Sequence, residues 1–219
     1  NSKIFLNELK KNNLNKVLII GGASQGSGTE LLMNSDNISI TSVDKIATKN
    51  VNYIADAHYL PFKDETFDGV WIQAVLEHVI SPSKVIDEIY RVLKKNGFVY
   101  AETPFMQQIH MGKDDYTRFT VSGHRYLFNK FENIKYGVNG GPAIALAWSI
   151  KYFFWSIFNE KISVYASLIP FLILRFIDKF ISEKNSWDGA SGVYFFGKKN
   201  VNYKFEKNEL NNLYKGKQN

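Results

Sequence analysis

The chain has 219 residues, 45% of them hydrophobic and 22% charged, which suits one domain with a full hydrophobic core. It has no cysteine, which excludes disulfides, thiolate metal sites and a cysteine nucleophile. The net charge of +6 comes from lysines spread along the chain, so it indicates a solvated surface, or a basic rim facing an anionic sugar or acidic membrane, rather than a nucleic-acid module.

Strands and helices are expected to alternate over the first half of the chain. An amphipathic opening precedes residues 16–20, an apolar run too short for a helix that stops at a glycine turn. Helical spacing begins at Pro82 with Ser81 as the N-cap, and Asn96 and Gly97 are expected to close that helix in a left-handed turn. The expected strands and helices together predict a mostly parallel sheet covered on both faces. They are strands over 16–20, 38–43, 51–54, 67–72 and 98–103, and helices over 29–33 and 82–95.

The last third of the chain has a different pattern. Residues 131–138 and 193–196 are predicted strands. The long aromatic and apolar stretch 142–182 between them predicts two or three helices inserted before the final strand. The expected organisation is one domain over 1–198, an apolar helical insert at 142–187 within it, and a ragged, polar tail over 199–219.

A glycine-rich turn and two acids form a candidate ligand site, because ligands of open parallel sheets bind beyond the carboxyl ends of the strands. The first strand ends in residues 21–28, whose glycines permit close approach of a ligand, although such turns also arise for structural reasons. Asp44 ends the second strand, where a carboxylate accepts both ribose hydroxyls unless it serves as a cap. Asp56, after the third strand, is placed to accept an adenine amino hydrogen while a neighbouring backbone N–H meets a ring nitrogen.

Four stretches, 56–62, 66–70, 75–79 and 91–97, resemble in order and spacing the class I S-adenosylmethionine-dependent methyltransferases, type 11-like. The loop that follows residue 104 resembles the same loop in members associated with bacterial surface-glycan assembly. The resemblance implies an α/β fold, a three-layer, Rossmann-like, seven-stranded, mostly parallel sheet with the last strand antiparallel. It also implies S-adenosylmethionine as the cofactor.

The resemblance further implies which residues hold this cofactor. Asp44 would hold the ribose, Asp56 and Ala57 the adenine, and Gln73 and Ala74 would close over the cofactor at the end of the fourth strand. The methionine part is expected at the turn after the first strand, which contributes Gly21, Gly22, Ala23, Ser24 and Gly26. The chain departs from the family in two places: the acid usual two positions before the first glycine is Ile19 here, and the glycine repeat is more open.

The loop after the fifth strand, residues 104–120, is the candidate acceptor site. Methyl transfer is an in-line displacement, so the protein must align the acceptor and, for a hydroxyl, remove its proton. His110 or Asp115 is predicted as the general base, with Tyr116 and Arg118 contacting a polar or anionic acceptor. A structural loop histidine and an ion pair between Arg118 and Asp115 are the alternatives.

His78, after the fourth strand, is a second candidate base and a predicted substrate-binding residue, although in the superfamily this position often only supports the loop. A metal site from His110, Asp114 and Asp115 is conceivable, since some glycan methyltransferases use a divalent cation. No tight ligand spacing demands such a site, so no metal is expected.

The apolar insert has two interpretations. Residues 143–158 carry Lys151 as their one charge, and 162–181 are interrupted by Pro170, so neither stretch suits a membrane-spanning helix. The structural interpretation is that these helices cover the sheet edge or form a homodimer contact. The functional one is that residues 142–182 lie in a membrane interface or line a groove for a lipid-linked acceptor.

The leading prediction is O-methylation of a small polar acceptor, a sugar or glycan intermediate that is free or lipid-linked. The expected location is the cytoplasm, with the inner face of the membrane as the alternative. One rival is an NAD(P)-dependent Rossmann oxidoreductase, because Gly21, Ala23 and Gly26 with Asp44 also suit a nicotinamide cofactor. The later elements at 56–57 and 76–79 argue against it. The second rival is a non-catalytic cofactor fold associated with the membrane.

Overall fold

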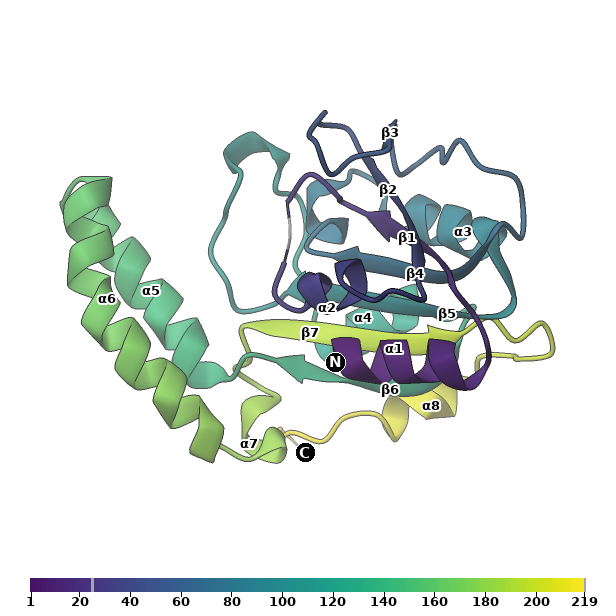
Figure 1. Cartoon of the computed structure of the whole chain (residues 1–219). Helices are drawn as coiled ribbons and strands as arrows, with labels where there is room; N and C mark the ends of the chain where they lie inside the picture. The colour runs from purple at the N-terminus through teal and green to yellow at the C-terminus, as the bar shows by residue number, and fades with distance from the viewer. Residues whose placement is uncertain (25, 219) are drawn as a thin grey trace.

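Seven strands form one sheet in the computed structural model, which describes residues 1–24 and 26–218 (Figure 1). They are β1 (Lys16–Ile20), β2 (Ser39–Asp44), β3 (Tyr53–Ile54), β4 (Phe67–Gln73), β5 (Leu93–Pro104), β6 (Glu132–Asn139) and β7 (Gly192–Lys198). Their order is β3-β2-β1-β4-β5-β7-β6, and β7 runs antiparallel to both of its neighbours while the other neighbouring pairs are parallel. The predicted fold class is confirmed.

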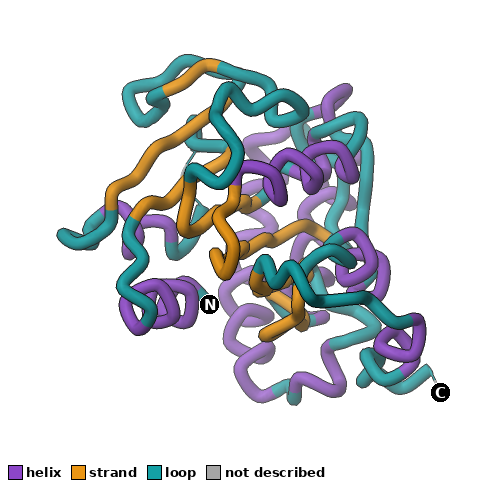
Figure 2. Tube along the Cα trace, turned by 90° about the vertical axis from the view of Figure 1, so that its right-hand side faces the viewer, coloured by secondary structure: helices purple, strands orange, loops and turns teal. Residues whose placement is uncertain are grey.

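Helices lie on both sides of this sheet (Figures 1 and 2). The α-helices are α1 (Ser2–Lys11), α2 (Thr29–Met33), α3 (Pro82–Val92), α4 (Val121–Leu127), α5 (Pro142–Ile157), α6 (Glu160–Ile177), α7 (Glu183–Ser186) and α8 (Lys207–Asn211). Short 3₁₀ turns are η1 (Leu76–His78), η2 (Gly112–Asp114) and η3 (Asp178–Phe180). Successive strand residues point to opposite faces, so each face of the sheet has its own core.

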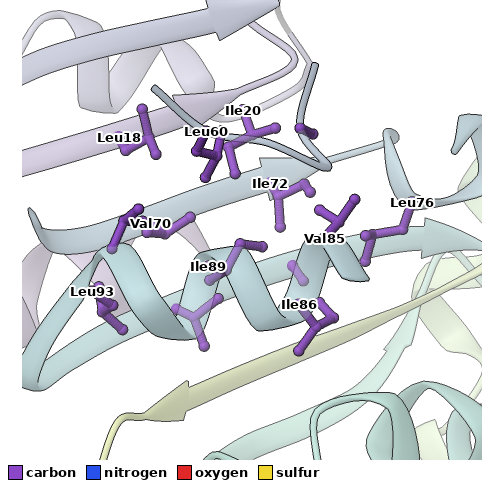
Figure 3. Close-up of a cluster of buried hydrophobic side chains, with 14 of the residues drawn as sticks. Leu18, Ile20, Leu60, Val70, Ile72, Leu76, Val85, Ile86, Ile89 and Leu93 are labelled. Carbon is purple, nitrogen blue, oxygen red and sulfur yellow. The ribbon is translucent and has the colours of Figure 1, made fainter. Parts of the chain in front are cut away.

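The first core lies between α3 and the sheet (Figure 3). Val85, Ile86 and Ile89 recur at helical spacing, so α3 presents one apolar stripe to the strands. That stripe packs on Leu18 and Ile72, which project from one face of β1 and β4. Each fully buried aliphatic side chain of this kind contributes about 1.5–3 kcal/mol to the free energy of unfolding.

The second core lies on the opposite face, where α1 covers the sheet. Phe5 packs edge-on against Trp71 with ring centroids 5.6 Å apart, and Trp71 stacks on Tyr100 at 4.1 Å. Gly69 permits this approach, because a Cβ at that position would lie 2.9 Å from the Phe5 ring. The amphipathic opening is thus a helix that completes the core.

One boundary prediction is wrong. The helix expected over 82–95 ends at Val92, and β5 begins at Leu93, which pairs with Phe67. Asn96 does adopt a left-handed conformation, with φ 63°, but it belongs to a bulge inside β5. The backbone is already extended at Leu93, with φ −79° and ψ 132°, and there its side chain is fully buried in the first core.

The segment after residue 198 also differs from its prediction, since it packs on the body instead of forming a ragged end. Leu213 is buried, and the buried Arg125 guanidinium donates to the Tyr203 hydroxyl at 2.6 Å and to Glu209 at 3.0 Å. A buried guanidinium requires such partners. The C-terminal segment therefore supplies the counter-charge that Arg125 in α4 needs.

The apolar insert forms a projecting arm, defined here as α5 and α6, which pack on each other and extend away from the sheet (Figure 1). The expected number of helices is confirmed, but the interpretation that they cover the sheet edge is wrong. Asp178 fixes the root of the arm, because its carboxylate accepts hydrogen bonds from the backbone N–H groups of Gly141, Ala143 and Ile144 at 2.9–3.0 Å. Within the described residues, no helix combines the length and apolarity needed to cross a bilayer.

Acid is expected to destabilise the fold through His124 of α4. Burial lowers the pKa of this side chain to about 3, whereas the unfolded chain takes up the proton near 6.5. The free energy of unfolding therefore falls as the pH drops from 6.5 towards 3, by about 2 kcal/mol between pH 7 and pH 5. Urea denaturation at both pH values should show this fall, and His124→Leu should lose that part of it. An unchanged pH dependence in the variant would contradict the assignment.

Candidate active site

The carboxyl ends of β1, β2, β4 and β5 meet at one edge of the sheet, because these strands are parallel. The turn after β1, Asp44 at the end of β2, η1 after β4 and the loop 105–120 after β5 all leave from this edge. Every residue that the sequence predicted for the cofactor or the acceptor belongs to one of these segments, to the turn after β3 or, for Gln73 and Ala74, to the end of β4 and the residue after it. The structure therefore gathers both predicted sets at the same edge.

The turn after β1 is held closely between β2 and β4. Gly21 has φ 87°, a conformation that favours glycine, and a Cβ there would collide with the Val75 side chain. The Gly21 N–H donates to the Val43 carbonyl at 2.9 Å. Gly26 lies against the Gln73 amide, which a Cβ would also strike, and Ser24 is exposed. The glycines thus serve the close packing of the turn as well as an open edge for a ligand.

Asp44 is oriented by two backbone amides. Its Oδ2 accepts from the N–H of Ala23 at 2.9 Å, and its Oδ1 accepts from the N–H of Ile46 at 2.9 Å. A carboxylate has about four lone-pair sites, so each oxygen can still accept one further hydrogen bond. This geometry fits the two hydroxyls of a ribose and joins the second predicted site residue to the glycine turn.

Asp56 is more heavily engaged than the sequence suggested. Its Oδ1 accepts from the backbone of His58 at 2.9 Å, and its Oδ2 pairs with the Lys45 ammonium at 3.0 Å. Burial opposes ionisation, but these hydrogen bonds lower the pKa of Asp56 to about 2, so the group is an anion at neutral pH. Lys45 is largely exposed, so this ion pair lies at the surface. Ala57 beside it is buried.

Gln73 and Ala74 turn the chain at the end of β4. The Gln73 amide donates to Glu102 at 2.7 Å and to the Ser27 carbonyl at 3.2 Å, so it spans from β5 to the glycine turn. Ala74 has φ 53°, unusual for a residue with a Cβ, and its N–H donates to the Glu102 carbonyl at 3.0 Å. Glu102 was not predicted as a site residue. The one signal that could have found it is that an acid lies near the end of a buried strand.

The acceptor loop is fixed internally by Arg118. Its guanidinium donates to the carbonyls of Gln107, Gln108 and Thr117, each at 3.0 Å. It also forms a bidentate pair with Asp115, one bond of which measures 2.6 Å. All five N–H donors of a guanidinium are thereby used, so none is left for an acceptor in this conformation.

Asp115 orients His110. Its side chain is 1% exposed, and its Oδ2 accepts the backbone N–H of His110 at 2.8 Å and lies 3.5 Å from the ring Nδ1. Burial opposes ionisation, but the bonds from Arg118 and His110 lower the pKa of Asp115 to about 2. A carboxylate with such a low pKa is a weak proton acceptor at neutral pH.

His110 and His78 meet at a third group, Glu77. The two Nε2 atoms lie 3.1 Å apart, and Oε1 of Glu77 lies 3.7 Å from the Nε2 of His78 and 3.6 Å from that of His110. The Tyr116 N–H donates to the Glu77 carbonyl at 2.8 Å, which holds the acceptor loop over η1. We call Glu77, His78 and His110 the histidine cluster.

Electrostatics within the histidine cluster favour a positive charge. The Glu77 carboxylate raises the pKa of His110 above its usual range, against the opposing effect of burial. Glu77 lies in the stretch 75–79 that carries the family resemblance but was not predicted as a site residue, and its position directly before His78 was the one available signal. Tyr116, predicted to contact the acceptor, is half exposed, and its hydroxyl lies 3.3 Å from Asp114.

Two surface cavities lie elsewhere. One, of about 570 Å³, is lined by residues that include Glu65 and Lys199, at the amino ends of β4 and β5 and so opposite the candidate site. The other, of about 460 Å³, is lined by Trp187 and Lys215 near α7. Neither contains a predicted site residue. We therefore assign the site from the strand edge and its hydrogen bonds.

Comparison with known proteins gives a family for part of the chain. Residues 22–101 match the family described as a methyltransferase domain. A demethylmenaquinone methyltransferase of Clavibacter sepedonicus is 40% identical over 67 residues, which are 29% of this chain and 27% of that protein. The chain thus spans well under two thirds of this relative.

Solved structures share the fold. A protein of Galdieria sulphuraria assigned as a sarcosine dimethylglycine methyltransferase superposes with a TM-score of 0.60 at 16% identity, covering 91% of this chain and 85% of that one. Phosphoethanolamine N-methyltransferase 2 of Haemonchus contortus, in complex with S-adenosyl-L-methionine, has a TM-score of 0.54 at 17% identity, covering 90% and 52%. At these identities the structures show the fold alone, and it is the family match over residues 22–101 that confirms the expected class of domain and its cofactor. None of these relatives is named for surface glycans, so that part of the resemblance stays a prediction.

Proposed function

Starting from a methyltransferase domain that uses S-adenosylmethionine, we propose that this chain methylates a hydroxyl of a small polar acceptor carried on a lipid. One observation carries the proposal. The acceptor loop contributes His110 to the histidine cluster, and its neighbouring residue contacts the apolar arm. In that contact the Tyr152 hydroxyl of α5 donates to the Ile109 carbonyl at 2.6 Å. The candidate chemistry is therefore joined to a large exposed apolar surface.

The cofactor is assigned to the edge formed by the glycine turn, Asp44, Asp56 and the end of β4. When bound, S-adenosylmethionine supplies a methyl group on a positively charged sulphur, which becomes neutral after transfer. Asp44 would orient the ribose, and Asp56 would accept from the adenine. Gln73 and Ala74 would limit the pocket beside the methionine part, as the family resemblance implies.

The acceptor proton is assigned to His110. Its ring is 30% exposed, whereas Glu77 is fully buried and Asp115 nearly so, which makes His110 the member of this group that an acceptor can reach. As the acceptor oxygen forms its bond to the methyl carbon, the hydroxyl proton passes to the imidazole. Glu77 then stabilises the imidazolium.

The other predicted residues receive positioning or contact roles. Asp115 holds the backbone and ring of His110, and Arg118 in turn holds Asp115 and three carbonyls of the loop. His78 supports the cluster from η1. Tyr116 is the exposed side chain that we assign to acceptor contact.

The arm is proposed to lie on a membrane that contains anionic lipids. Its exposed large hydrophobic side chains recur at helical spacing along one broad face of α6, and α5 adds further exposed ones, which is more apolar surface than scattered exposed residues would give. They include Leu146, Phe153, Trp155, Ile157, Phe158, Ile162, Tyr165, Leu168, Ile169, Leu172, Ile173 and Phe176. Four basic residues against two acids over 142–182 complement an acidic surface. The inner membrane face stays the predicted location.

Flotation should detect this membrane contact. Wild-type protein is expected to float with vesicles that contain anionic phosphatidylserine, and to float less with neutral vesicles or at high salt. A variant with Tyr165→Ser, Ile169→Ser and Leu172→Ser should remain at the bottom. The control Ile80→Ser removes an equally exposed hydrophobic residue outside the arm and should float like the wild type.

Light scattering without vesicles tests the alternative that a second copy of the chain, instead of a membrane, covers the arm. A homodimer that dissociates in the triple variant, together with no flotation of the wild type, would replace the membrane by a second copy of the chain. In that case the proposed lipid carrier loses its support.

A transfer assay tests the acceptor. We expect tritium from methyl-labelled S-adenosylmethionine to enter the organic phase of a bacterial lipid extract, and to a lesser extent the water-soluble glycan fraction. Alkaline and acid hydrolysis of the labelled lipid would separate a sugar ether from a quinone ring, which the name of the Clavibacter relative makes the second candidate. Calorimetry should show binding of the cofactor and none of NAD⁺ or NADP⁺. Label confined to the aqueous fraction would refute the lipid carrier.

A further inference from the structure

Glu77 is a fully buried carboxylate without a hydrogen-bond donor. Its side chain is 0% exposed, and within the part of the chain that the structure describes neither carboxylate oxygen has a hydrogen-bond partner. Leaving an ionised carboxylate buried and unpaired costs several kcal/mol. An ionised Glu77 therefore needs a cation nearby, and the two nearest groups are imidazoles.

The three nearest atoms of the histidine cluster have the spacing of metal ligands. Oε1 of Glu77 and the two Nε2 atoms are separated by 3.1, 3.6 and 3.7 Å. The point equidistant from all three lies about 2.0 Å from each, which matches the ligand distances of about 2.0–2.2 Å for Zn²⁺. A single ion at this point would contact the carboxylate and both rings without movement of the backbone.

The Nε2 atoms of both rings face each other across this point, 3.1 Å apart, and one proton between them would give way to the ion. Nδ1 of His78 lies 2.7 Å from the Asp114 carbonyl and therefore carries the proton, which leaves Nε2 as an acceptor. Nδ1 of His110 faces the Asp115 carboxylate at 3.5 Å. A hydrogen-bonded carbonyl or carboxylate behind the ring is the usual support of a metal-bound histidine. His78 has such a carbonyl, whereas Nδ1 of His110 has only the charge of the Asp115 carboxylate nearby and no hydrogen bond within the described residues.

We propose that Glu77, His78 and His110 bind one divalent transition-metal cation. Two imidazoles and one carboxylate suit Zn²⁺, Co²⁺ or Mn²⁺, and three protein ligands leave at least one coordination position open. Mg²⁺ prefers oxygen ligands and should bind weakly. The set differs from the sequence-based alternative of His110, Asp114 and Asp115, because the Asp115 carboxylate is occupied by Arg118.

The ion would change the role of His110. In the metal-free protein the imidazole itself takes the acceptor proton, whereas a coordinated imidazole is a ligand and the cation lowers the pKa of a bound hydroxyl. Glu77 and His110 therefore take part in both the metal-free and the metal-bound arrangement. The inference concerns binding of the ion alone and holds whether or not the chain is a methyltransferase.

Titration of tag-free, chelator-treated protein tests the site. Calorimetry with Zn²⁺ is expected to show one ion per chain, and Co²⁺ should give the visible absorption of a low-coordinate nitrogen and oxygen site. Glu77→Gln and His110→Ala should each lower the Zn²⁺ affinity by about 100-fold or more. Asp114→Asn is the matched control, since it removes a neighbouring acid, and should leave the affinity within about twofold of the wild type.

Two results would overturn the proposal. One is Zn²⁺ affinity that is unchanged in folded Glu77→Gln and His110→Ala, which would mean that a proton shared between Glu77 and His110 is the sole cation of the cluster. The other is a large loss in Asp114→Asn, which would move the site to the acids of the loop. Thermal unfolding of each variant shows that it is folded, and the Co²⁺ spectrum of the wild type provides the reading if Glu77→Gln fails to fold.

Discussion

Replacing His110 by Ala and Asp115 by Asn together is expected to lower turnover by about 10²–10⁴-fold, the usual contribution of a positioned proton acceptor. Binding of S-adenosylmethionine should remain, because Asp44 and the glycine turn lie on other segments of the edge. Turnover is measured with labelled cofactor and the acceptor fraction identified above, and binding by calorimetry. A double variant with wild-type turnover would contradict the assignment of the proton acceptor.

The single variants separate the two roles. If Asp115 acts by holding His110, then Asp115→Asn alone lowers turnover. The same substitution should have little further effect in a chain that already carries His110→Ala. Two independent effects that multiply would instead make Asp115 a direct participant. Lys113→Ala is the control, because Lys113 is an exposed charge of the same loop. Thermal unfolding reports any loss of the Arg118 contacts in Asp115→Asn.

Replacing Asp44 by Ala is expected to weaken S-adenosylmethionine binding by about 100-fold. Hydrogen bonds to a charged group contribute about 1.5–3 kcal/mol each, and the variant would lose those to the ribose. Calorimetry with S-adenosylhomocysteine measures this without turnover. Affinity equal to that of the wild type would refute the ribose assignment.

Asp44 also has a structural role, so the prediction needs a second variant. Its carboxylate caps the N–H groups of Ala23 and Ile46, and Ala removes both bonds. Asp44→Asn keeps one acceptor oxygen and should bind the cofactor with intermediate affinity. Asp36→Ala removes an exposed acid of the same chain and should bind as the wild type does.

Local sequence patterns were sufficient to predict the strands and helices that position the candidate cofactor residues. The run 16–20 is β1 as predicted, and the spacing from Pro82 is α3, because alternation and helical periodicity depend on neighbours within a few residues. Asp44 and the glycine turn were placed together for the same reason, since parallel strands bring their carboxyl ends to one edge. The end of α3 was misplaced because burial of Leu93 is a property of the core.

The acceptor site was only partly predictable. The loop 104–120 could be selected by its chemistry, and the alternative of an ion pair between Arg118 and Asp115 is the arrangement that the structure shows. The carbonyl contacts that use the other donors of Arg118 have no signal in the local pattern. Glu77 was likewise invisible as a partner, since it lies 33 positions before His110 in the chain. Contacts of this range depend on how a loop closes over the sheet, and no local periodicity records that.

The sequence by itself thus determined a mostly parallel sheet with helices on both faces, because short-range hydrophobic periodicity fixes which side chains enter the core. The seven strands, the antiparallel last strand and most of the candidate cofactor residues came from the family resemblance. The tertiary structure alone decided that the apolar insert projects as an arm and that Glu77, His78 and His110 converge. An apolar composition indicates that a surface will be covered, but it does not indicate what covers it. The three residues of the histidine cluster come from two separate segments, and only the folded chain defines the distance between those segments.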